Sequence, residues 1–396
     1  MTYQDAFFDA PIDRRGTNCE KWDAIAAREG KELLPMWVAD MDFRCPTEIT
    51  DALVKRAAHP VYGYTEQTAE QEEALLSFLS RRHGVVIEAA QQYTLPCVVT
   101  GLCAAVNALT EPGDGVIVQP PVYGPFFRTI RESGREILEN TLVRGQDGRY
   151  TMDFDGLEAF CQKGAKLMLL CSPHNPVGRC WTKEELLRLW AIVNRYGVTL
   201  ISDEIHWDFV YEEGAFTSML ALPETQASSA ALAVLTSASK TFNLAGLLQA
   251  TLLTRNASLM QALAKELQST GVTQGNLFSQ AATEAAYREG EPWLTGLLAY
   301  LHKSRAIVAE ELAARLPKAV LSPIEATYLA WVDLRAYGFS CKELERRTHA
   351  QGVAFTEGTF FGTEAGEGFL RINFACPHSQ LREAFVRLEK AIIAND

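Results

Sequence analysis

The chain lacks the sequence features of membrane-spanning, secreted and metal-binding proteins. No apolar run approaches the roughly 18 residues that a membrane helix needs, and the first residues show no basic segment followed by an apolar one. None of the nine cysteines lies in a C-x-x-C pair, and none of the seven histidines lies in an H-x-x-x-H pair around a carboxylate. We therefore expect no membrane span, no signal peptide and no metal site.

Positive charge is also scarce. Lys and Arg number 37 against 49 Asp and Glu, which gives a formal net charge of −12. Such a balance argues against a surface that binds nucleic acid or an anionic membrane. The cysteine count is odd, and several cysteines lie in apolar runs, as in Leu169-Leu170-Cys171. They are typical of reduced core residues, so we expect a cytoplasmic protein.

Length and pattern predict an α/β fold with two domains. The chain has 396 residues, 47% of them hydrophobic, which is too long for one ordinary core. From residue 93, short apolar runs alternate with helical stretches, as in a mostly parallel sheet covered on both faces. We expect an N-terminal arm that joins the small domain over 1–45, a large domain over 46–290 and a smaller α+β domain over 291–396.

The individual elements follow from apolar periodicity and from capping residues. Thr182 suits a helix N-cap, and Gly84 suits a helix end. Strands are predicted over 93–100, 115–119, 166–171, 198–202, 232–236, 249–254, 328–333 and 369–374. Helices are predicted over 20–28, 46–59, 68–83, 101–109, 183–196, 257–269, 276–289, 291–316, 342–351 and 378–394.

One lysine stands out by its position. Lys240 follows the predicted strand 232–236 after only three residues, so it lies where the chain leaves a sheet. That is an unusual place for a solvated charge, and a lysine whose pKa is lowered forms imines with carbonyl compounds. Taken alone, Lys240 is equally well explained as a structural lysine of a loop.

Other predicted strands also end in conspicuous residues. Gly101, Tyr123, Asn175 and Asp203 follow predicted strands, and ligands of open parallel sheets bind outside the carboxyl ends of the strands. Each of these residues alone also fits a turn, a core edge or a helix cap. Together with Lys240 they predict a single site.

That site fits pyridoxal 5′-phosphate (PLP). A lysine holds the aldehyde of this cofactor as an imine, and a strand-end aspartate pairs with its protonated ring nitrogen. Asn175 can donate to the ring oxygen, and Tyr123 can stack on the ring. The phosphate requires amide donors from a helix start and hydroxyl donors, which we assign to Gly101, Leu102, Ser237 and Ser239.

Six stretches carry a resemblance that covers essentially the whole chain. They are M-W-V-A-D-M-D-F at 36–43, V-Y-G-Y at 61–64, S-P-H-N-P-V-G-R at 172–179, S-D-E-I-H at 202–206, S-K-T-F-N-L-A-G-L at 239–247 and L-R-I-N-F at 370–374. With them the chain resembles the fold-type I PLP-dependent enzymes of the aminotransferase superfamily. The N-P-x-G and S-x-S-K elements specify only the superfamily. The D-E-I-H and K-T-F-N-x-A-G-L stretches, with the W-V-A-D-M-D-F arm, are more specific and are similar to its C–S β-lyase branch, the cystathionine β-lyases of the MalY/PatB type.

The resemblance implies a large domain built on a mostly parallel seven-stranded sheet and a role for each cofactor residue. Lys240 would bind the cofactor and then take the Cα proton of the substrate, and Asp203 would hold the ring nitrogen. His206 stands where many aminotransferases have a tyrosine. Asn175 would face the ring hydroxyl and the substrate, and Tyr123 would lie on the ring as a cofactor-binding and catalytic residue.

The resemblance also implies residues for the substrate and for a partner subunit. Arg371 would bind the substrate carboxylate with two parallel hydrogen bonds, and Trp37 and Ala39 of the arm would close over the substrate. Tyr64 would reach the cofactor phosphate of the neighbouring subunit in a homodimer. A strand-edge salt bridge and packing of the loop or arm are the structural alternatives for these residues. Leu248 replaces the phosphate-binding arginine of many aminotransferases, which favours the lyase branch.

The function implied by the resemblance is an α,β-elimination. L-Cystathionine or another S-substituted L-cysteine would give a thiol, such as homocysteine, together with pyruvate and ammonia. An aminotransferase on the same fold would use the same lysine chemistry, and a PLP-binding regulatory or partner-binding protein would not need it. The sequence leaves these alternatives open, along with the identity of the sulfur substrate and the pathway.

Overall fold

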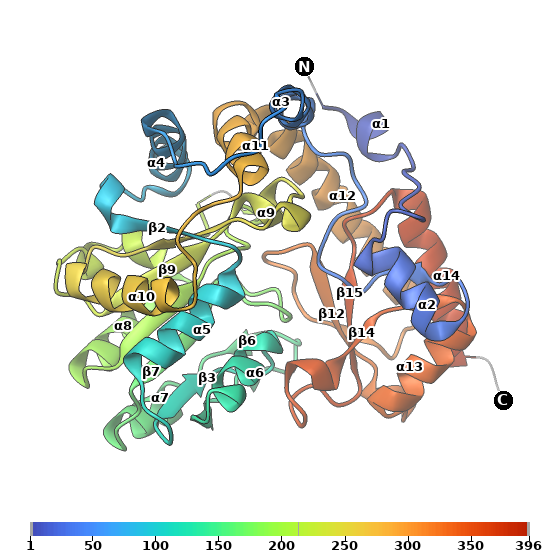
Figure 1. Ribbon diagram of the computed structural model, residues 1–396. Coiled ribbons are helices and arrows are strands. Elements are labelled where there is room, and N and C mark those ends of the chain that lie inside the picture. The colour runs from blue at the N-terminus through green and yellow to red at the C-terminus, as the bar shows by residue number, and fades with distance from the viewer. Residues whose placement is uncertain (1–2, 213, 394–396) are drawn as a thin grey trace.

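A seven-stranded sheet is the largest element of the computed structural model, which describes residues 3–212 and 214–393 (Figure 1). In their order across the sheet, the strands are β2 (Gln92–Leu95), β10 (Ala250–Leu253), β9 (Leu232–Thr236), β8 (Thr199–Asp203), β7 (Leu167–Cys171), β3 (Gly115–Val118) and β4 (Glu136–Glu139). Neighbouring strands from β9 to β4 are parallel, whereas β10 is antiparallel to both of its neighbours. The predicted mostly parallel sheet is confirmed.

The central strands are apolar because both faces of the sheet are covered. Alternate residues of β7 join different cores, with Met168 and Leu170 in one and Leu167 and Leu169 in the other. The helices of this part of the chain are α3 (Thr47–Ala57), α4 (Ala69–His83), α5 (Val98–Leu109), α6 (Pro125–Glu132), α7 (Phe154–Gln162), α8 (Lys183–Arg195), α9 (Ala238–Thr241), α10 (Ala257–Ser269) and α11 (Leu277–Glu289).

A second, antiparallel sheet lies in the C-terminal part of the chain. Its strands, in order, are β11 (Val320–Leu321), β12 (Leu329–Asp333), β15 (Phe369–Asn373) and β14 (Thr356–Glu357). The accompanying helices are α12 (Glu291–Arg315), α13 (Cys341–Ala350) and α14 (His378–Ile393). α12 runs from the large sheet towards this part (Figure 1). The domain boundaries at 45/46 and 290/291 stay a prediction.

The N-terminal arm packs against the C-terminal part, far from it in sequence. β1 (Leu34–Pro35) pairs in parallel with β13 (Val353–Ala354). The arm also contains α1 (Asp5–Phe8), a π-helical turn (Glu20–Ala24) and α2 (Ile25–Glu29). The remaining elements are the hairpin β5 (Val143–Arg144) with β6 (Tyr150–Thr151), and 3-10 turns at Ala89–Gln91, Met219–Ala221, Pro223–Thr225, Ala245–Leu247, Arg335–Tyr337 and Gly358–Phe361.

Helix ends follow the predicted capping residues where those residues are strong. Thr68 and Thr182 form capping boxes at the starts of α4 and α8, and Gly84 ends α4 in the left-handed conformation with φ 64°. The sequence pattern did not reveal α6, α7 or β4, and β4 has only two apolar residues between its terminal glutamates. No helix among the described residues is long and apolar enough to cross a membrane.

The start of α5 differs from the prediction. The predicted strand 93–100 is confirmed only to Leu95, where β2 ends, and its predicted end is wrong because Cys97 is the N-cap of α5. Gly101 and Leu102 therefore lie inside the helix and do not open it. A Cβ atom on Gly101 would stand 2.6 Å from Leu235 Cδ2 and 2.8 Å from Leu95 Cδ1. The glycine thus allows α5 to pack closely on β9 and β2.

Candidate active site

Lys240 lies just beyond the carboxyl end of β9, in the short helix α9. Ser237 caps this helix, since its Oγ accepts a hydrogen bond from the Ser239 amide at 2.9 Å. The Lys240 Nζ donates to the carbonyl oxygen of Ala39 at 2.6 Å. Burial is the main cause that lowers the pKa of Lys240 to about 8; the Arg371 guanidinium acts in the same direction, and nearby carboxylates oppose it. A useful fraction of this amine is therefore unprotonated near neutral pH.

Two further buried groups lie at the end of β8, the neighbouring strand. Burial raises the pKa of Asp203 to about 7, although the Ile205 amide, which donates to its Oδ1 at 3.1 Å, and Lys240 both act to lower the pKa. Burial holds the pKa of His206 well below its usual value, and Lys240 and Arg371 act in the same direction. Among the described residues, nothing hydrogen-bonds to His206 Nδ1. Both side chains face a site whose polar groups are incompletely satisfied.

Arg371 is a buried cation on β15 without an acidic partner. Its Nη1 donates to Asn175 Oδ1 at 3.1 Å, and its Nη2 donates to the Trp37 carbonyl oxygen at 2.7 Å and to Thr356 Oγ1 at 3.2 Å. Among the described residues, no carboxylate forms an ion pair with it and its Nε has no hydrogen-bond partner. Desolvation lowers the pKa of Arg371 to about 10. This geometry speaks against a strand-edge salt bridge.

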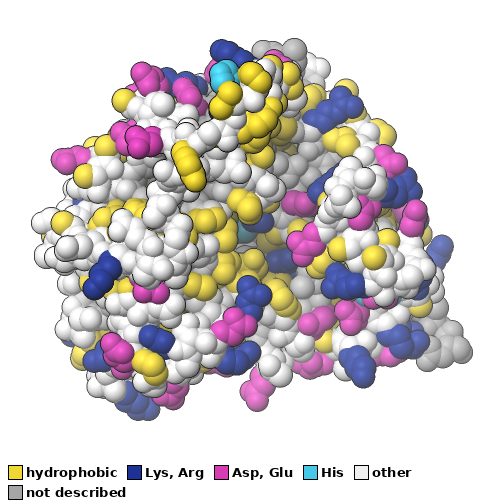
Figure 2. Space-filling model, in the orientation of Figure 1, with side chains coloured by type: hydrophobic (Ala, Val, Ile, Leu, Met, Phe, Trp, Pro, Cys, Tyr) yellow, Lys and Arg dark blue, Asp and Glu magenta, His cyan; other side chains and the backbone are white. Residues whose placement is uncertain are grey.

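Tyr123 belongs to the same cluster. Burial raises the pKa of its hydroxyl, Arg371 lowers it and Asp203 raises it, so both charges lie within electrostatic reach of the ring. The structure thus brings together six residues from two parts of the chain, namely Lys240, Asp203, His206, Asn175, Tyr123 and Arg371. Figure 2 shows a hollow between the part that carries the large sheet and the C-terminal part, where hydrophobic side chains surround a few basic ones.

Trp37 meets this cluster with its backbone. Its indole Nε1 donates to the Lys21 carbonyl oxygen at 3.1 Å, and the Arg28 guanidinium lies 5.0 Å from its ring centroid. Only the Trp37 carbonyl contacts Arg371. The indole is therefore engaged in packing within the arm, which is the structural alternative for this residue.

The arm contributes contacts that the sequence did not reveal. The Ala39 carbonyl accepts from Lys240 and also from the hydroxyl of buried Tyr328, at 2.9 Å. Asn243 holds the next residues of the arm through three hydrogen bonds to backbone atoms, and Asn373 donates to two further arm carbonyls. Two signals were available in the sequence: Tyr328 directly precedes a buried strand, and Asn243 stands three residues after Lys240.

The expected phosphate donors differ in availability. The Ser237 hydroxyl donates to the Gln249 carbonyl oxygen at 2.5 Å, so its proton is already used. Among the described residues, no group hydrogen-bonds to the Ser239 hydroxyl. The amides of Gly101 and Leu102 lie inside α5, beyond its start. The Thr100 amide already donates to the Cys97 carbonyl oxygen at 3.1 Å, which leaves residues 98 and 99 as the amide donors of this helix start that lack helical acceptors.

Tyr64 lies apart from the buried cluster. Its side chain is 98% exposed, in the loop between α3 and α4. Leu248 is also largely exposed and has the left-handed φ of 56°. A role for Tyr64 in this site of the same chain has no support in these contacts.

The chemistry of the cluster fits PLP. An amine with a lowered pKa suits an aldehyde, and the desolvated carboxyl of Asp203 would be relieved by a cationic ring nitrogen. The unpartnered His206 Nδ1 offers one further contact to such a ring. Among the described residues, no group of three His, Cys, Asp or Glu side chains is placed to hold a metal ion.

The similarity of this chain to known proteins extends over nearly its whole length and is not confined to these motifs. The family model of class I and II aminotransferases matches residues 32–388. Cystathionine β-lyase PatB of Bacillus subtilis is 39% identical over 97% of this chain and 99% of its own, and protein MalY of Escherichia coli is 34% identical over 98% and 99%. The crystal structure of cystalysin from Treponema denticola, which contains PLP, matches with a TM-score of 0.94 and 34% identity over 99% of both chains.

Proposed function

The chain belongs to the family of class I and II aminotransferases, and we propose that it is a PLP-dependent C–S β-lyase acting on L-cystathionine or related S-substituted L-cysteines. The observation that carries the proposal is that one buried site contains both Lys240, an amine with a lowered pKa, and Arg371, a buried guanidinium that lacks an acidic partner among the described residues. An amino acid supplies the missing carboxylate. The similarity to PatB and MalY over nearly the full length favours the lyase reaction.

Each residue of the cluster has a task in this reaction. Bound PLP supplies an electron sink for the Cα carbanion. Asp203 stabilises positive charge at the ring nitrogen, and Tyr123 and Asn175 hold the ring. Arg371 binds the substrate carboxylate with two of its N–H groups and so fixes the orientation of the Cα–H bond.

Proton transfer falls to Lys240. Its neutral amine takes the Cα proton, and the Cβ–S bond then breaks so that the sulfur leaves with the bonding electron pair and is protonated to a thiol. Addition of one water molecule to the remaining three-carbon fragment yields pyruvate and ammonia. The Ala39 carbonyl, itself fixed by Tyr328, is a ready acceptor for the protonated lysine.

A keto-acid test separates this function from that of an aminotransferase. The purified holoenzyme is given L-cystathionine without any keto acid, and thiol, pyruvate and ammonia are measured. We expect equal amounts of the three products from the wild type and none from Lys240→Ala. Turnover that depends on an added keto acid would identify an aminotransferase instead.

We also propose a symmetric homodimer in which Tyr64 reaches the cofactor phosphate of the partner subunit. The support is the exposed aromatic loop: Val61 and Tyr62 are also more than half exposed, and such a patch is typical of an interface. A location in the cytoplasm is supported by the nine cysteines, all of which are free.

A further inference from the structure

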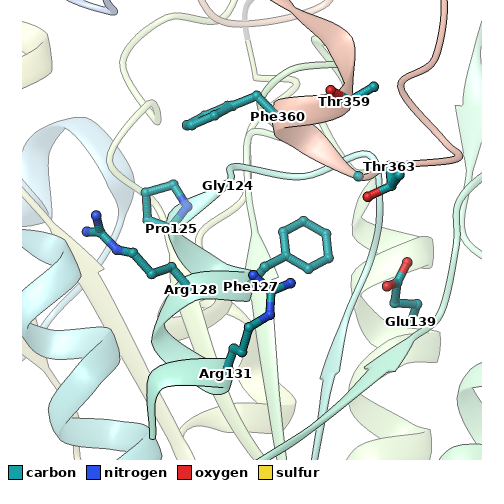
Figure 3. A pocket seen from close by; sticks show the side chains of 10 residues that line it. Gly124, Pro125, Phe127, Arg128, Arg131, Glu139, Thr359, Phe360 and Thr363 are labelled. Atoms are coloured by element: carbon teal, nitrogen blue, oxygen red, sulfur yellow. The ribbon is translucent and has the colours of Figure 1, made fainter.

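A pocket of about 300 Å³ lies between α6 and the C-terminal segment that contains the 3-10 turn Gly358–Phe361 (Figure 3). α6 contributes Arg128 and Arg131, the end of β4 contributes Glu139, and the C-terminal segment contributes Phe360 and Thr363. Figure 3 shows Arg131 between Arg128 on one side and Glu139 on the other, with Phe360 and Thr363 across the pocket. The two parts of the chain that form the active site therefore also form this pocket.

The charged side chains that line the pocket have no ion-pair partners among the residues that the structure describes. Arg128, Arg131 and Glu139 are exposed, and no ion pair or side-chain hydrogen bond joins any of them to another described residue. All four arginines of α8 and α13, by contrast, pair with carboxylates. Two cations and one anion around one cavity match the carboxylate and the ammonium group of an α-amino acid.

The pocket shares a wall with the active site. Gly124, which lines the pocket, directly follows Tyr123, and the Val122 amide donates to the Phe361 carbonyl oxygen at 2.8 Å. The centroid of the Phe361 ring lies 4.8 Å from Arg371 Cζ. Arg128 is close enough to lower the pKa of the Tyr123 hydroxyl. The pocket therefore directly adjoins the site in which Arg371 lies.

We propose that this pocket binds the distal α-amino acid end of a thioether substrate, with Arg128 and Arg131 on its carboxylate and Glu139 on its ammonium group. The exposed face of Phe360 borders the path of the thioether chain. This inference rests on the proposed lyase function and narrows its substrate class. The preferred substrates carry a second amino acid on sulfur, as L-cystathionine does, and simple S-alkyl cysteines are the poorer substrates.

The test compares two substrates that differ only beyond the sulfur atom. The value of kcat/KM is measured for L-cystathionine and for S-ethyl-L-cysteine. The readout is the value for L-cystathionine divided by the value for S-ethyl-L-cysteine. For Arg131→Gln and Arg128→Gln we expect the ratio to fall about tenfold or more, which corresponds to the loss of one charge-assisted contact. Glu139→Gln should lower it as well. Arg188→Gln, at an exposed arginine of α8 that does not line the pocket, is the matched control and should keep the wild-type ratio.

The outcomes separate the pocket from the reaction. A ratio within twofold of the wild type in both arginine variants would overturn the proposed pocket while leaving the lyase function intact. Release of no thiol from either substrate by the wild type would refute the lyase function. In that case, calorimetric binding of L-cystathionine still decides on the pocket: weaker binding to Arg131→Gln than to Arg188→Gln supports it, and equal binding contradicts it.

Discussion

Lys240 and Arg371 are two buried cations with lowered pKa values, and the Arg371 guanidinium contributes to the lowered pKa of Lys240. Neither has an ion-pair partner among the described residues within the active site, and desolvation lowers the pKa of both groups. Lys21 is the counterexample, because this equally buried lysine pairs with Asp42 at 2.9 Å and its pKa is raised. Burial acts to lower the pKa of both lysines, and at Lys21 the paired carboxylates outweigh it.

The lowered pKa predicts how the cofactor-free protein takes up PLP. Only the neutral amine attacks the aldehyde, so the rate should rise about tenfold per pH unit below pH 8 and level off above it. In Arg371→Gln the removal of a neighbouring positive charge raises the pKa of Lys240, so the midpoint moves to higher pH. Stopped-flow absorbance measures the rate. A rate that still climbs between pH 9 and pH 10 in the wild type would contradict the lowered pKa.

Substitution of the guanidinium by an ammonium tests the carboxylate site. A lysine side chain cannot form two parallel hydrogen bonds to a carboxylate, so Arg371→Lys should raise KM for L-cystathionine by about tenfold or more. PLP binding, followed by its absorption band, should stay close to the wild type. Steady-state kinetics decide the question, and an unchanged KM would show that the substrate carboxylate binds elsewhere.

The arm segment 36–43 is the element that joins the two parts of the site. Asn243 Oδ1 accepts from the Met41 amide at 3.0 Å, and its Nδ2 donates to the carbonyls of Met41 and Phe43, each at 2.9 Å. Asn243 itself has φ 61°, a conformation that asparagine tolerates better than most residues. Asn243, three positions after Lys240, thus fixes the arm whose Ala39 carbonyl oxygen accepts the hydrogen bond from Lys240 Nζ.

Loss of this clamp should loosen the arm. Asn243→Ala removes three hydrogen bonds to backbone groups, at a cost of about 3 kcal/mol in the free energy of unfolding. Urea denaturation measures the change, with Asn107→Ala at an exposed position of α5 as the control. Equal stability of the two variants would show that the arm does not depend on Asn243.

At the same scale, the sequence placed most strand ends and helix starts within one residue, and the boundary between β2 and α5 is the exception. Asp203 ends the largely buried strand β8, and Lys240 follows the buried strand β9 after three residues, so both were found from their position at a strand end. The start of α5 was misplaced because the apolar character continues through 93–102, and only Pro96 and Cys97 mark the break. The contacts of Ala39 with Tyr328 and Lys240 join residues 289 and 201 positions apart, and such contacts leave no local pattern.

In the whole molecule, the question is whether a single subunit supplies every residue of one active site. Tyr64 is almost fully exposed, so it would act on its partner's site and not on its own. A mass of twice 43.8 kDa is expected in solution, measured by light scattering. A dimeric mass alone does not show in which active site Tyr64 acts. An experiment that mixes the subunits of two variants does.

Complementation tests the shared site. Tyr64→Ala and Lys240→Ala should each be nearly inactive, and a mixed dimer of the two contains one site with both native residues. Unfolding and refolding an equal mixture should therefore restore about one quarter of the wild-type activity. If activity does not rise above that of the separate variants, Tyr64 acts within its own chain or not at all.

Lys240 is the residue that we propose carries the cofactor. Borohydride treatment of the holoenzyme fixes PLP to the amine that holds it, and mass spectrometry of the tryptic peptides then locates the added mass. We expect the label on the peptide that contains Lys240, with no label in Lys240→Ala. A label on another lysine, such as the buried Lys21, or no label at all, would contradict it.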